Sequence, residues 1–325
     1  LMARGGHAVA AVFAMFLVAA PARAGWLEVE RADADLDLPA ARQLGLATLA
    51  ESATSADAVA VASWWLRSLD HLQEPEAILS ASGAERDPEL GFLLARVAGK
   101  LASRPPAGAL ATAELAGPFG RFDTLDLLRG VVPAEDQLPA LGTRWSGPSQ
   151  PFRLRLRSAD GWVGPPEAMA VSGAYLAAWS VVAEAPVTGW LVIEANASVN
   201  LSLDGSELAR LRECGVVDPA ATWYRVELDP GAHRIRVEMA SRGVPMVRVS
   251  LVDETGSPME SVRSGGEAPW AASRARAAPP PAAAAVAEQA ARADADVPTV
   301  LVAAAVARGR GDPGDQRRWL ERALE

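Results

Sequence analysis

The stretch VNLSLDGSELARL, residues 199–211, decides the fold that we predict for this chain. Val199, Leu201 and Leu203 alternate with polar residues, as in a strand that buries one face. The pair Asp204-Gly205 then separates this run from a second one, and Asp-Gly between two strands is a strong indication of a type I′ hairpin turn. The alternative is the acidic corner of a metal or sugar site, which would need further carboxylates for Ca²⁺. The sequence favours the hairpin.

The same period of two recurs in four other runs, at residues 152–156, 224–228, 235–239 and 247–251. In each run apolar residues alternate with Arg, Glu, Asp or Ser, which is typical of an antiparallel strand with one solvated face. Sequences rich in Asp, Gly and Pro separate the runs and favour turns. Many short strands at this spacing predict an antiparallel β-sandwich or barrel.

Helical periodicity flanks the β-region on both sides. From Pro39 to Ala102 apolar residues recur at spacings of three and four, and Asp87 followed by Pro88 is a typical helix start. A helical pattern returns at Val286, after a stretch rich in Gly, Pro and Ala. We therefore predict a multidomain α and β chain with these parts: a signal peptide at 1–24, helical hairpins at 25–108, a β-sandwich at 109–264, a Pro/Ala-rich linker at 265–283 and helical repeats at 284–325.

The first residues predict export. Arg4 precedes the apolar run at residues 8–20, and Ala22-Arg23-Ala24 is a cleavage site of the small-x-small kind. The run is short for a membrane span, and no other run reaches the roughly 18 apolar residues that a span needs. We expect cleavage after Ala24, a periplasmic or secreted chain and no stable membrane span, with an uncleaved N-terminal anchor as the alternative.

Composition excludes some partners. The 325 residues carry a net charge of −9, so we expect no nucleic-acid partner, and anionic membranes are disfavoured as well. Cys214 is the one cysteine in the sequence, so the fold has no intrachain disulfide. The favoured interpretation of Cys214 is an inert thiol.

The sequence contains no recognisable catalytic motif. After signal cleavage His71 and His233 are the two histidines left, whereas a His-based zinc site needs several converging ligands. There is no HExxH, no P-loop, no dinucleotide-binding glycine pattern and no Gly-x-Ser-x-Gly elbow. His233 adjoins an Asp-Pro-Gly turn, and we predict a solvated turn residue. We predict no catalytic residue, no cofactor and no metal.

Aromatic residues supply the candidate ligand contacts. Trp162, Trp179, Trp223 and Tyr224 lie within or beside the predicted strands. Burial in the core is the favoured interpretation for each, because buried Trp is ordinary in sandwiches. Trp162 is the strongest exception, since it lies in the Gly-rich stretch SADGWVGPP. An exposed indole there would stack on a sugar or a peptide.

Three segments carry resemblances to known families. GDPGDQRRWLERALE, residues 311–325, looks like a tetratricopeptide helix pair. The segments VNLSLDG, VELDPGAHRIRVEM and VRVSLVDETG resemble the strand pattern of PA14-like jelly-roll accessory domains, over about Phe152 to Met259. AGPFGRFDTLDLLRGVVPAEDQ, residues 116–137, is similar to a segment that precedes such sandwiches in exported bacterial tetratricopeptide proteins, some with a transglutaminase-like domain.

The resemblances imply a non-catalytic exported scaffold that mediates protein–protein interaction in the cell envelope, as the N-terminal part of a longer protein. Sugar-binding PA14-like members hold Ca²⁺ with adjacent aspartates, where this chain has Glu194, Asn196 and Ser198, so their lectin activity does not transfer. The alternatives are carbohydrate binding by the sandwich, and an accessory role beside the catalytic domain of a larger enzyme.

Overall fold

The structure is a computed structural model that describes residues 25–51, 56–67, 87–101, 108–122, 124–147, 150–211, 221–267, 269–310 and 312–324. The predicted signal peptide, His71 and Cys214 lie outside these residues. The chain divides into two compact units, one formed by Leu1–Ala98 with Pro280–Glu325 and the other by Gly99–Pro279. In the described part no helix is long and apolar enough to cross a membrane.

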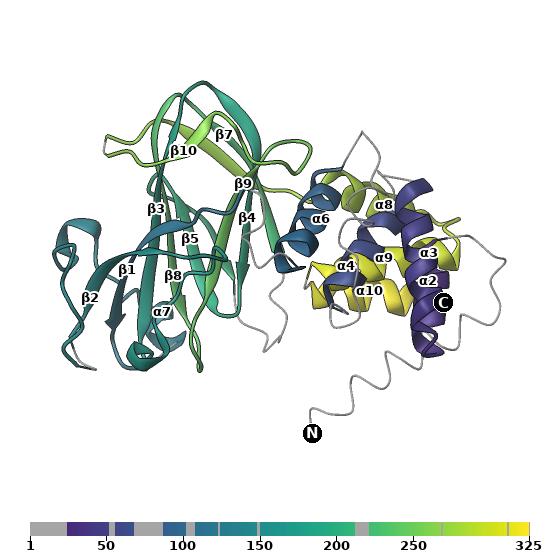
Figure 1. Ribbon diagram of the computed structural model, residues 1–325, viewed down its shortest axis with the longest axis horizontal. Helices are drawn as coiled ribbons and strands as arrows, with labels where there is room; N and C mark the ends of the chain where they lie inside the picture. Colours follow the sequence, from purple (N-terminus) through teal and green to yellow (C-terminus); the bar gives the residue numbers. More distant parts are fainter. Residues whose placement is uncertain are drawn as a thin grey trace. The chain divides into compact units, whose positions relative to one another are not determined.

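Helices from both ends of the chain form the first unit (Figure 1). They are α2 (Trp26–Ala34), α3 (Leu38–Glu51), α4 (Ala56–Arg67), α6 (Pro88–Leu101), α8 (Pro281–Ala291), α9 (Val297–Gly309) and α10 (Pro313–Ala323). Helix α4 packs against α8 and α9, and α2 also contacts α9. The helical segments that we predicted as separate parts therefore share one core.

One carboxylate caps helices from the two ends of the chain. The Oδ1 atom of Asp87 accepts hydrogen bonds from the N–H groups of Glu89 (2.9 Å) and Leu90 (3.4 Å), which confirms the predicted N-cap of α6. Its Oδ2 atom accepts from the N–H of Ala282 at the start of α8 (2.8 Å). Unpaired N–H groups at helix starts need such acceptors. Asp87 thus fixes α6 and α8 to each other.

A second acidic group lies beside this cap. Glu89 is buried, and its Oε1 atom lies 3.8 Å from Nε of Arg310. Its Oε2 atom has no hydrogen-bond partner among the described residues. Burial raises the pKa of Glu89 to about 7, against the opposing charge of Arg310. The folded protein therefore holds a proton there that the unfolded chain releases.

Two antiparallel sheets form the second unit. The larger has the order β2-β1-β3-β8-β5-β6, with β10 also paired to β3, and the smaller has the order β11-β7-β4-β9. The strands are β1 (Thr112–Phe119), β2 (Phe152–Arg157), β3 (Ala174–Ala183), β4 (Val187–Ala195), β5 (Ser198–Leu203), β6 (Ser206–Leu211), β7 (Ala221–Leu228), β8 (Gly231–Ala240), β9 (Val247–Val252), β10 (Val262–Ser264) and β11 (Ser273–Ala277).

The predicted runs are confirmed as β2, β5, β7, β8 and β9, and the predicted hairpin as β5–β6. Leu203 pairs with Ser206 across the turn. Asp204 has φ of 49° and Gly205 has φ of 81°, the two positive values that a type I′ turn requires. The opening stretch is a hairpin.

The core lies between the two sheets. Trp179 and Val237 of the larger sheet pack in one cluster with Ile193 and Val249 of the smaller, as period-two alternation requires. The prediction that each strand has a solvated face is wrong for β9, where every residue is buried. There Arg248 is buried because Glu194 neutralises it through two hydrogen bonds.

The predicted linker at 265–283 is wrong in part. Residues Ser273–Ala277 form β11, which pairs with β7, and α8 begins at Pro281. The sequence SRARA alternates Arg with small residues, and hydrogen bonding to an open sheet edge makes it a strand despite its poor apolar content. Between these elements residues 278–280 remain outside a helix or strand.

Gly205→Val tests the hairpin. The φ of 81° disfavours a β-branched residue, although no atom lies within 4 Å of where a Cβ would stand. The cost is then backbone strain alone, about 1–3 kcal/mol of unfolding free energy. Ser206→Ala, at the next exposed position, is expected to change stability by less than about 0.5 kcal/mol. Urea melts of the two variants measure the difference, and equal small effects would contradict the turn.

Glu89→Gln tests the buried carboxyl. Because the folded-state pKa of about 7 exceeds the ordinary 4.5, the folded protein is most stable below the ordinary value. It loses up to about 3 kcal/mol as the pH rises to the folded value. The Gln variant is expected to lack this loss and to be more stable than wild type at about pH 8. Urea unfolding followed by circular dichroism at low and high pH measures it. The exposed Glu321→Gln is the control, and a variant that keeps the wild-type pH dependence would overturn the prediction.

Candidate functional site

Three of the four predicted aromatic residues are core residues. Trp179, Trp223 and Tyr224 are all 1 % exposed or less, so the ligand-contact interpretation is wrong for them and the core interpretation is confirmed. The indole N–H of Trp179 donates to the carbonyl of Leu110 (3.0 Å). Trp223 packs edge-on against Trp190, with ring centroids 5.8 Å apart. Burial raises the pKa of Tyr224 to about 12.

Trp162 is half-buried and already has a stacking partner. The guanidinium carbon of Arg248 lies 4.7 Å from its ring centroid. Two hydrogen bonds to Glu194, at 2.6 and 2.8 Å, and a third to the carbonyl of Asp160 fix this guanidinium in place. A cation held over the indole covers one of its two faces. Trp162 therefore packs on the sandwich through Arg248, and Glu194 is engaged with the same guanidinium.

The prediction for His233 is wrong. The residue is fully buried, with Nδ1 2.8 Å from Oδ2 of Asp204 and Nε2 2.7 Å from the carbonyl oxygen of Asp229. A carbonyl oxygen accepts but does not donate, so Nε2 carries a proton. The parity of β8 explains the burial, because His233 lies two residues before the inward-facing Ile235. The imidazole ties the Asp204 turn to the turn before β8.

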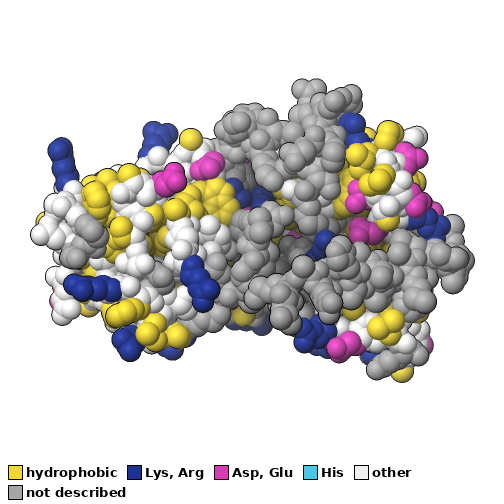
Figure 2. Space-filling view, turned by 90° about the horizontal axis from the view of Figure 1, so that it is seen from below, with side chains coloured by type: hydrophobic (Ala, Val, Ile, Leu, Met, Phe, Trp, Pro, Cys, Tyr) yellow, Lys and Arg dark blue, Asp and Glu magenta, His cyan; other side chains and the backbone are white. Residues whose placement is uncertain are grey.

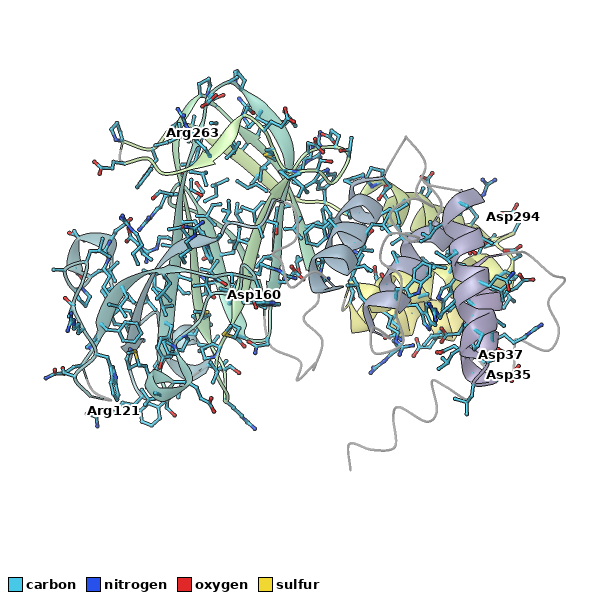
Figure 3. The ribbon with its side chains drawn as sticks, viewed as in Figure 1. Asp35, Asp37, Arg121, Asp160, Arg263 and Asp294 are labelled. Carbon is cyan, nitrogen blue, oxygen red and sulfur yellow. The ribbon has the colours of Figure 1, made fainter. Side chains whose placement is uncertain are left out.

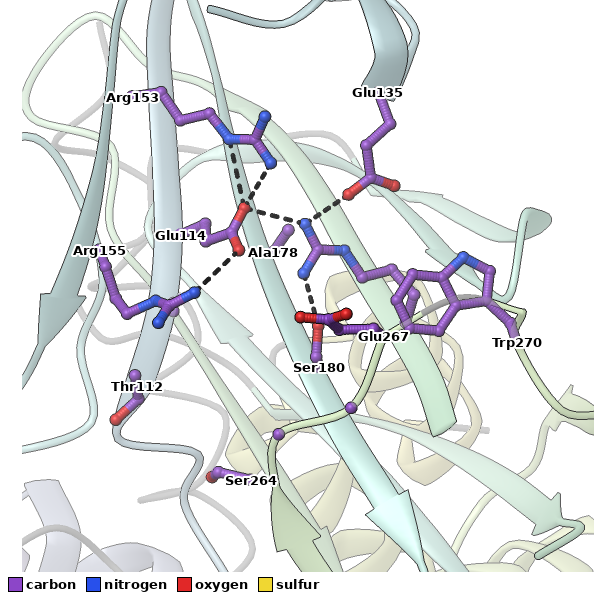
Figure 4. A pocket seen from close by; sticks show the side chains of 14 residues that line it. Thr112, Glu114, Glu135, Arg153, Arg155, Ala178, Ser180, Ser264, Glu267 and Trp270 are labelled. Carbon is purple, nitrogen blue, oxygen red and sulfur yellow. Dashed lines mark hydrogen bonds and ion pairs between the residues drawn. The ribbon is translucent and has the colours of Figure 1, made fainter. Parts of the chain in front are cut away.

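A polar pocket lies on the outer face of the larger sheet (Figure 4). Its volume is about 680 Å³. Strands β1, β2, β3 and β8 form the floor, while Glu135, residues 264–267 and Trp270 form the walls. Successive side chains of a strand point to opposite faces of the sheet. In the floor strands the side chains next to the inward-facing core residues therefore point outward, into the pocket. Among the described residues, this is the place where charged side chains from the most strands meet.

Arg234 is the central cation of the pocket. Its side chain is 6 % exposed, and its guanidinium donates to Ser180 Oγ (2.7 Å) and Glu114 Oε2 (3.1 Å). Its Nη2 atom also lies 2.5 Å from a carboxylate oxygen of Glu135. The Nε–H has no hydrogen-bond partner among the described residues. An unsatisfied buried donor is costly, so this group has capacity for one more acceptor.

Glu114 connects the cations of the floor. It accepts from Arg153 at 3.2 and 2.7 Å as well as from Arg234, and Arg155 lies 3.7 Å away. Burial by itself would raise the pKa of Glu114. The hydrogen bonds and charges of Arg153 and Arg234 outweigh burial, so the pKa lies below its ordinary value. The carboxylate is therefore ionised at neutral pH.

The rim of the pocket combines an aromatic ring with exposed charges. Trp270 is half-buried, and its ring centroid lies 5.9 Å from the Arg234 guanidinium carbon. Arg155 has a side chain that is 63 % exposed, and Glu267 is exposed across the pocket from it. Within the described residues no group of three or more His, Cys, Asp or Glu residues could hold a metal ion.

Sequence reasoning missed this pocket. Arg153 and Arg155 lie among the polar residues of the predicted run at 152–156, and Arg234 directly precedes the run at 235–239. Alternation places all three on an outer face, but no spacing in the sequence connects them with one another. Trp270 fell in the segment that we predicted as linker. From the sequence one could tell which side chains of each strand face outward. One could not tell which strands are neighbours in the sheet.

Comparisons with known proteins do not assign the chain to a family. No family model matches, and no curated protein matches. Among solved structures, a family 35 carbohydrate binding module from an environmental isolate aligns at 9 % identity with a TM-score of 0.25, over 50 % of this chain and 94 % of that one.

Two further structures align in the same way. The CBM35 from Cellvibrio japonicus Abf62 aligns at 14 % identity with a TM-score of 0.23, over 46 % of this chain and 93 % of that one. A β-glucosidase from Kluyveromyces marxianus in complex with glucose aligns at 10 % identity with a TM-score of 0.25, over 30 % of this chain and 14 % of that one. The description of the fold rests on the sheets of this chain itself.

Proposed function

We propose that the outer-face pocket binds a small carbohydrate. The volume of about 680 Å³ lies within the range of small-molecule sites, and one or two sugar rings fit such a space. The floor is a hydrogen-bonded sheet, which holds polar side chains more precisely than a loop does. The proposal rests on this pocket and not on the structural similarities.

The polar lining matches the chemistry of hydroxyl groups. Guanidinium groups only donate and carboxylates only accept, whereas each sugar hydroxyl both donates and accepts. The Arg153–Glu114–Arg234 network presents both kinds of group side by side (Figure 4). Neighbouring hydroxyls of one ring can therefore meet a donor and an acceptor together.

Trp270 provides the apolar contact. One face of a pyranose ring is made of C–H groups, and an aromatic surface buries such a face while its polar edge stays hydrated. Trp270 is half-buried at the wall of the pocket. A carbohydrate in this position would contact the indole on one side and the charged floor on the other.

Trp270→Ala tests the proposal. We expect saturable binding of at least one sugar from a panel of neutral and acidic mono- and disaccharides, and a Kd about tenfold weaker in the variant because an aromatic contact is lost. Arg155→Gln, at the exposed rim, is expected to weaken binding without unfolding the sheet. Calorimetric titration and saturation-transfer NMR measure both.

Trp162→Ala is the matched control, since its indole faces Arg248 outside this pocket. It is expected to leave the Kd unchanged. Absence of saturable binding to every sugar in the panel would contradict the proposal. A loss in Trp162→Ala as large as the loss in Trp270→Ala would do so as well.

We also propose that the chain meets its ligand outside the cytoplasm, as the N-terminal sequence predicts. The PA14-like and tetratricopeptide resemblances remain predictions. Mass spectrometry of protein recovered from the exported fraction is expected to find Gly25 at the N-terminus. A chain that retains Met2 in a membrane fraction would show that the apolar run is an anchor instead.

A further inference from the structure

An exposed apolar face lies on α7 (Thr124–Arg129) and the turn before it. Phe122 is 61 % exposed, Leu125 is 45 % exposed and Leu128 is 58 % exposed. Their spacing of three residues places them near one another on one side of the segment. Large apolar side chains gathered on a short exposed segment mark an interaction site.

This face is held rigidly by the residues behind it. The buried carboxylate of Asp126 accepts hydrogen bonds from the N–H groups of Arg121 and Phe122. Leu127 is buried, and α7 packs against β3, β5 and β8. Val132, which follows α7, fills an apolar cluster on the outer face of the larger sheet. The exposed side chains therefore have no room to turn inward.

Arg121 and Arg129 flank the apolar residues in the sequence, and the acidic Asp123 and Asp136 lie in the same segment. Arg121, Arg129 and Arg242 are exposed, and within the described residues none of them forms an ion pair. Arg242 follows the end of β8, against which α7 packs. Arg121 points away from this end of the sandwich (Figure 3). Seen from below, the sandwich shows hydrophobic side chains with both basic and acidic side chains beside them (Figure 2). Asp123 lies outside the described residues.

The acidity of the chain is not spread evenly. The segment from residue 99 to 279 contains eighteen Lys and Arg against twenty Asp and Glu, although the whole chain carries −9. Most of the acidic excess thus belongs to the helical segments. The expectation that net charge disfavours an anionic surface therefore rests mainly on charges outside residues 99–279.

We propose that the α7 face docks on the surface of an anionic lipid bilayer. Phe122, Leu125 and Leu128 would enter the boundary between headgroups and acyl chains, and the three Arg would contact lipid phosphates. Apolar side chains beside basic ones are the combination that interfacial membrane binding uses. The contact is peripheral and requires no spanning helix.

Two features favour a lipid surface over a second copy of this chain. Two side chains on a six-residue helix and one just before it cover far less than the roughly 800 Å² per partner of a standard protein interface. A twofold contact would also bring the same Arg residues of two copies together, and like charges repel. A bilayer has no such size requirement and supplies negative charge.

Vesicle sedimentation of the full chain tests this proposal. We expect binding to phosphatidylcholine vesicles that contain a third of phosphatidylglycerol, weak binding to phosphatidylcholine alone, and a marked decrease at high salt. The double variant Phe122→Ser/Leu128→Ser is expected to lower the partition coefficient by at least about tenfold. The variant Arg121→Gln/Arg129→Gln is expected to remove the preference for the anionic vesicles.

Leu36→Ser is the matched control, because Leu36 is exposed on the helical unit, and it is expected to bind as wild type does. Thermal melts check that each variant is folded. Equal binding of wild type and the Phe122/Leu128 variant, or no binding to anionic vesicles, would overturn the proposal. The proposal would also be overturned if light scattering showed that the wild-type protein self-associates and that the Phe122→Ser/Leu128→Ser variant does not. Sugar binding in the Trp270 pocket is expected to be unchanged in these variants, so the two proposals fail separately.

Discussion

The buried guanidinium of Arg234 is the interaction on which the outer face of the larger sheet depends. A guanidinium cannot be left unpaired in a buried place without a large desolvation cost. Glu114 on β1, Ser180 on β3 and Glu135 beyond α7 all contribute contacts to it. One side chain on β8 therefore connects β1, β3 and the segment after α7. These contacts of Arg234 hold the lining of the pocket together.

The same alternation that sends Arg234 outward sends its neighbour His233 inward. Asp204 contacts both residues: its Oδ2 atom lies beside the imidazole of His233, and its Oδ1 atom accepts from the backbone N–H of Arg234 (2.7 Å). The Asp-Gly turn is thus a turn, as the sequence predicted, whose carboxylate also satisfies buried groups of the adjacent strand. A solvent-exposed Asp in the same turn would leave Nδ1 of the imidazole without this partner.

Much of the sandwich could be predicted because many strands show their alternation in the sequence. The strands that were missed, such as β3 with AYLAAWSVVA and β4 with VTGWLVIEA, are mostly buried on both faces, so their polar residues are few. Period-two reasoning cannot distinguish such a run from a buried helix. β11 was missed for the opposite reason: it has hardly any apolar residues, and its pairing with β7 decides its conformation.

The site could be predicted only in part, because it joins residues that are distant in the chain. Glu114 and Arg234 are 120 positions apart. The alternation within each strand places both side chains on an outer face of a sheet. It does not show that their strands, β1 and β8, are separated by β3 alone. His233 could have been predicted as buried from Ile235, Val237 and Met239, had the strand been extended by two residues. Trp162 looked exposed because its partner, Arg248, lies on a strand far along the chain.

Residues 120–122 and 124–138 contribute to both of the surfaces that we propose. Of these residues, the apolar Val132 and Leu138 pack on the outer face of the sheet beside Leu176, and Glu135 between them reaches Arg234. The preceding α7 directs its remaining apolar residues away from the sheet. A segment that satisfies a buried cation with one side chain and covers an apolar sheet with others has few conformations open to it. The pocket wall and the exposed apolar face are therefore fixed by the same packing.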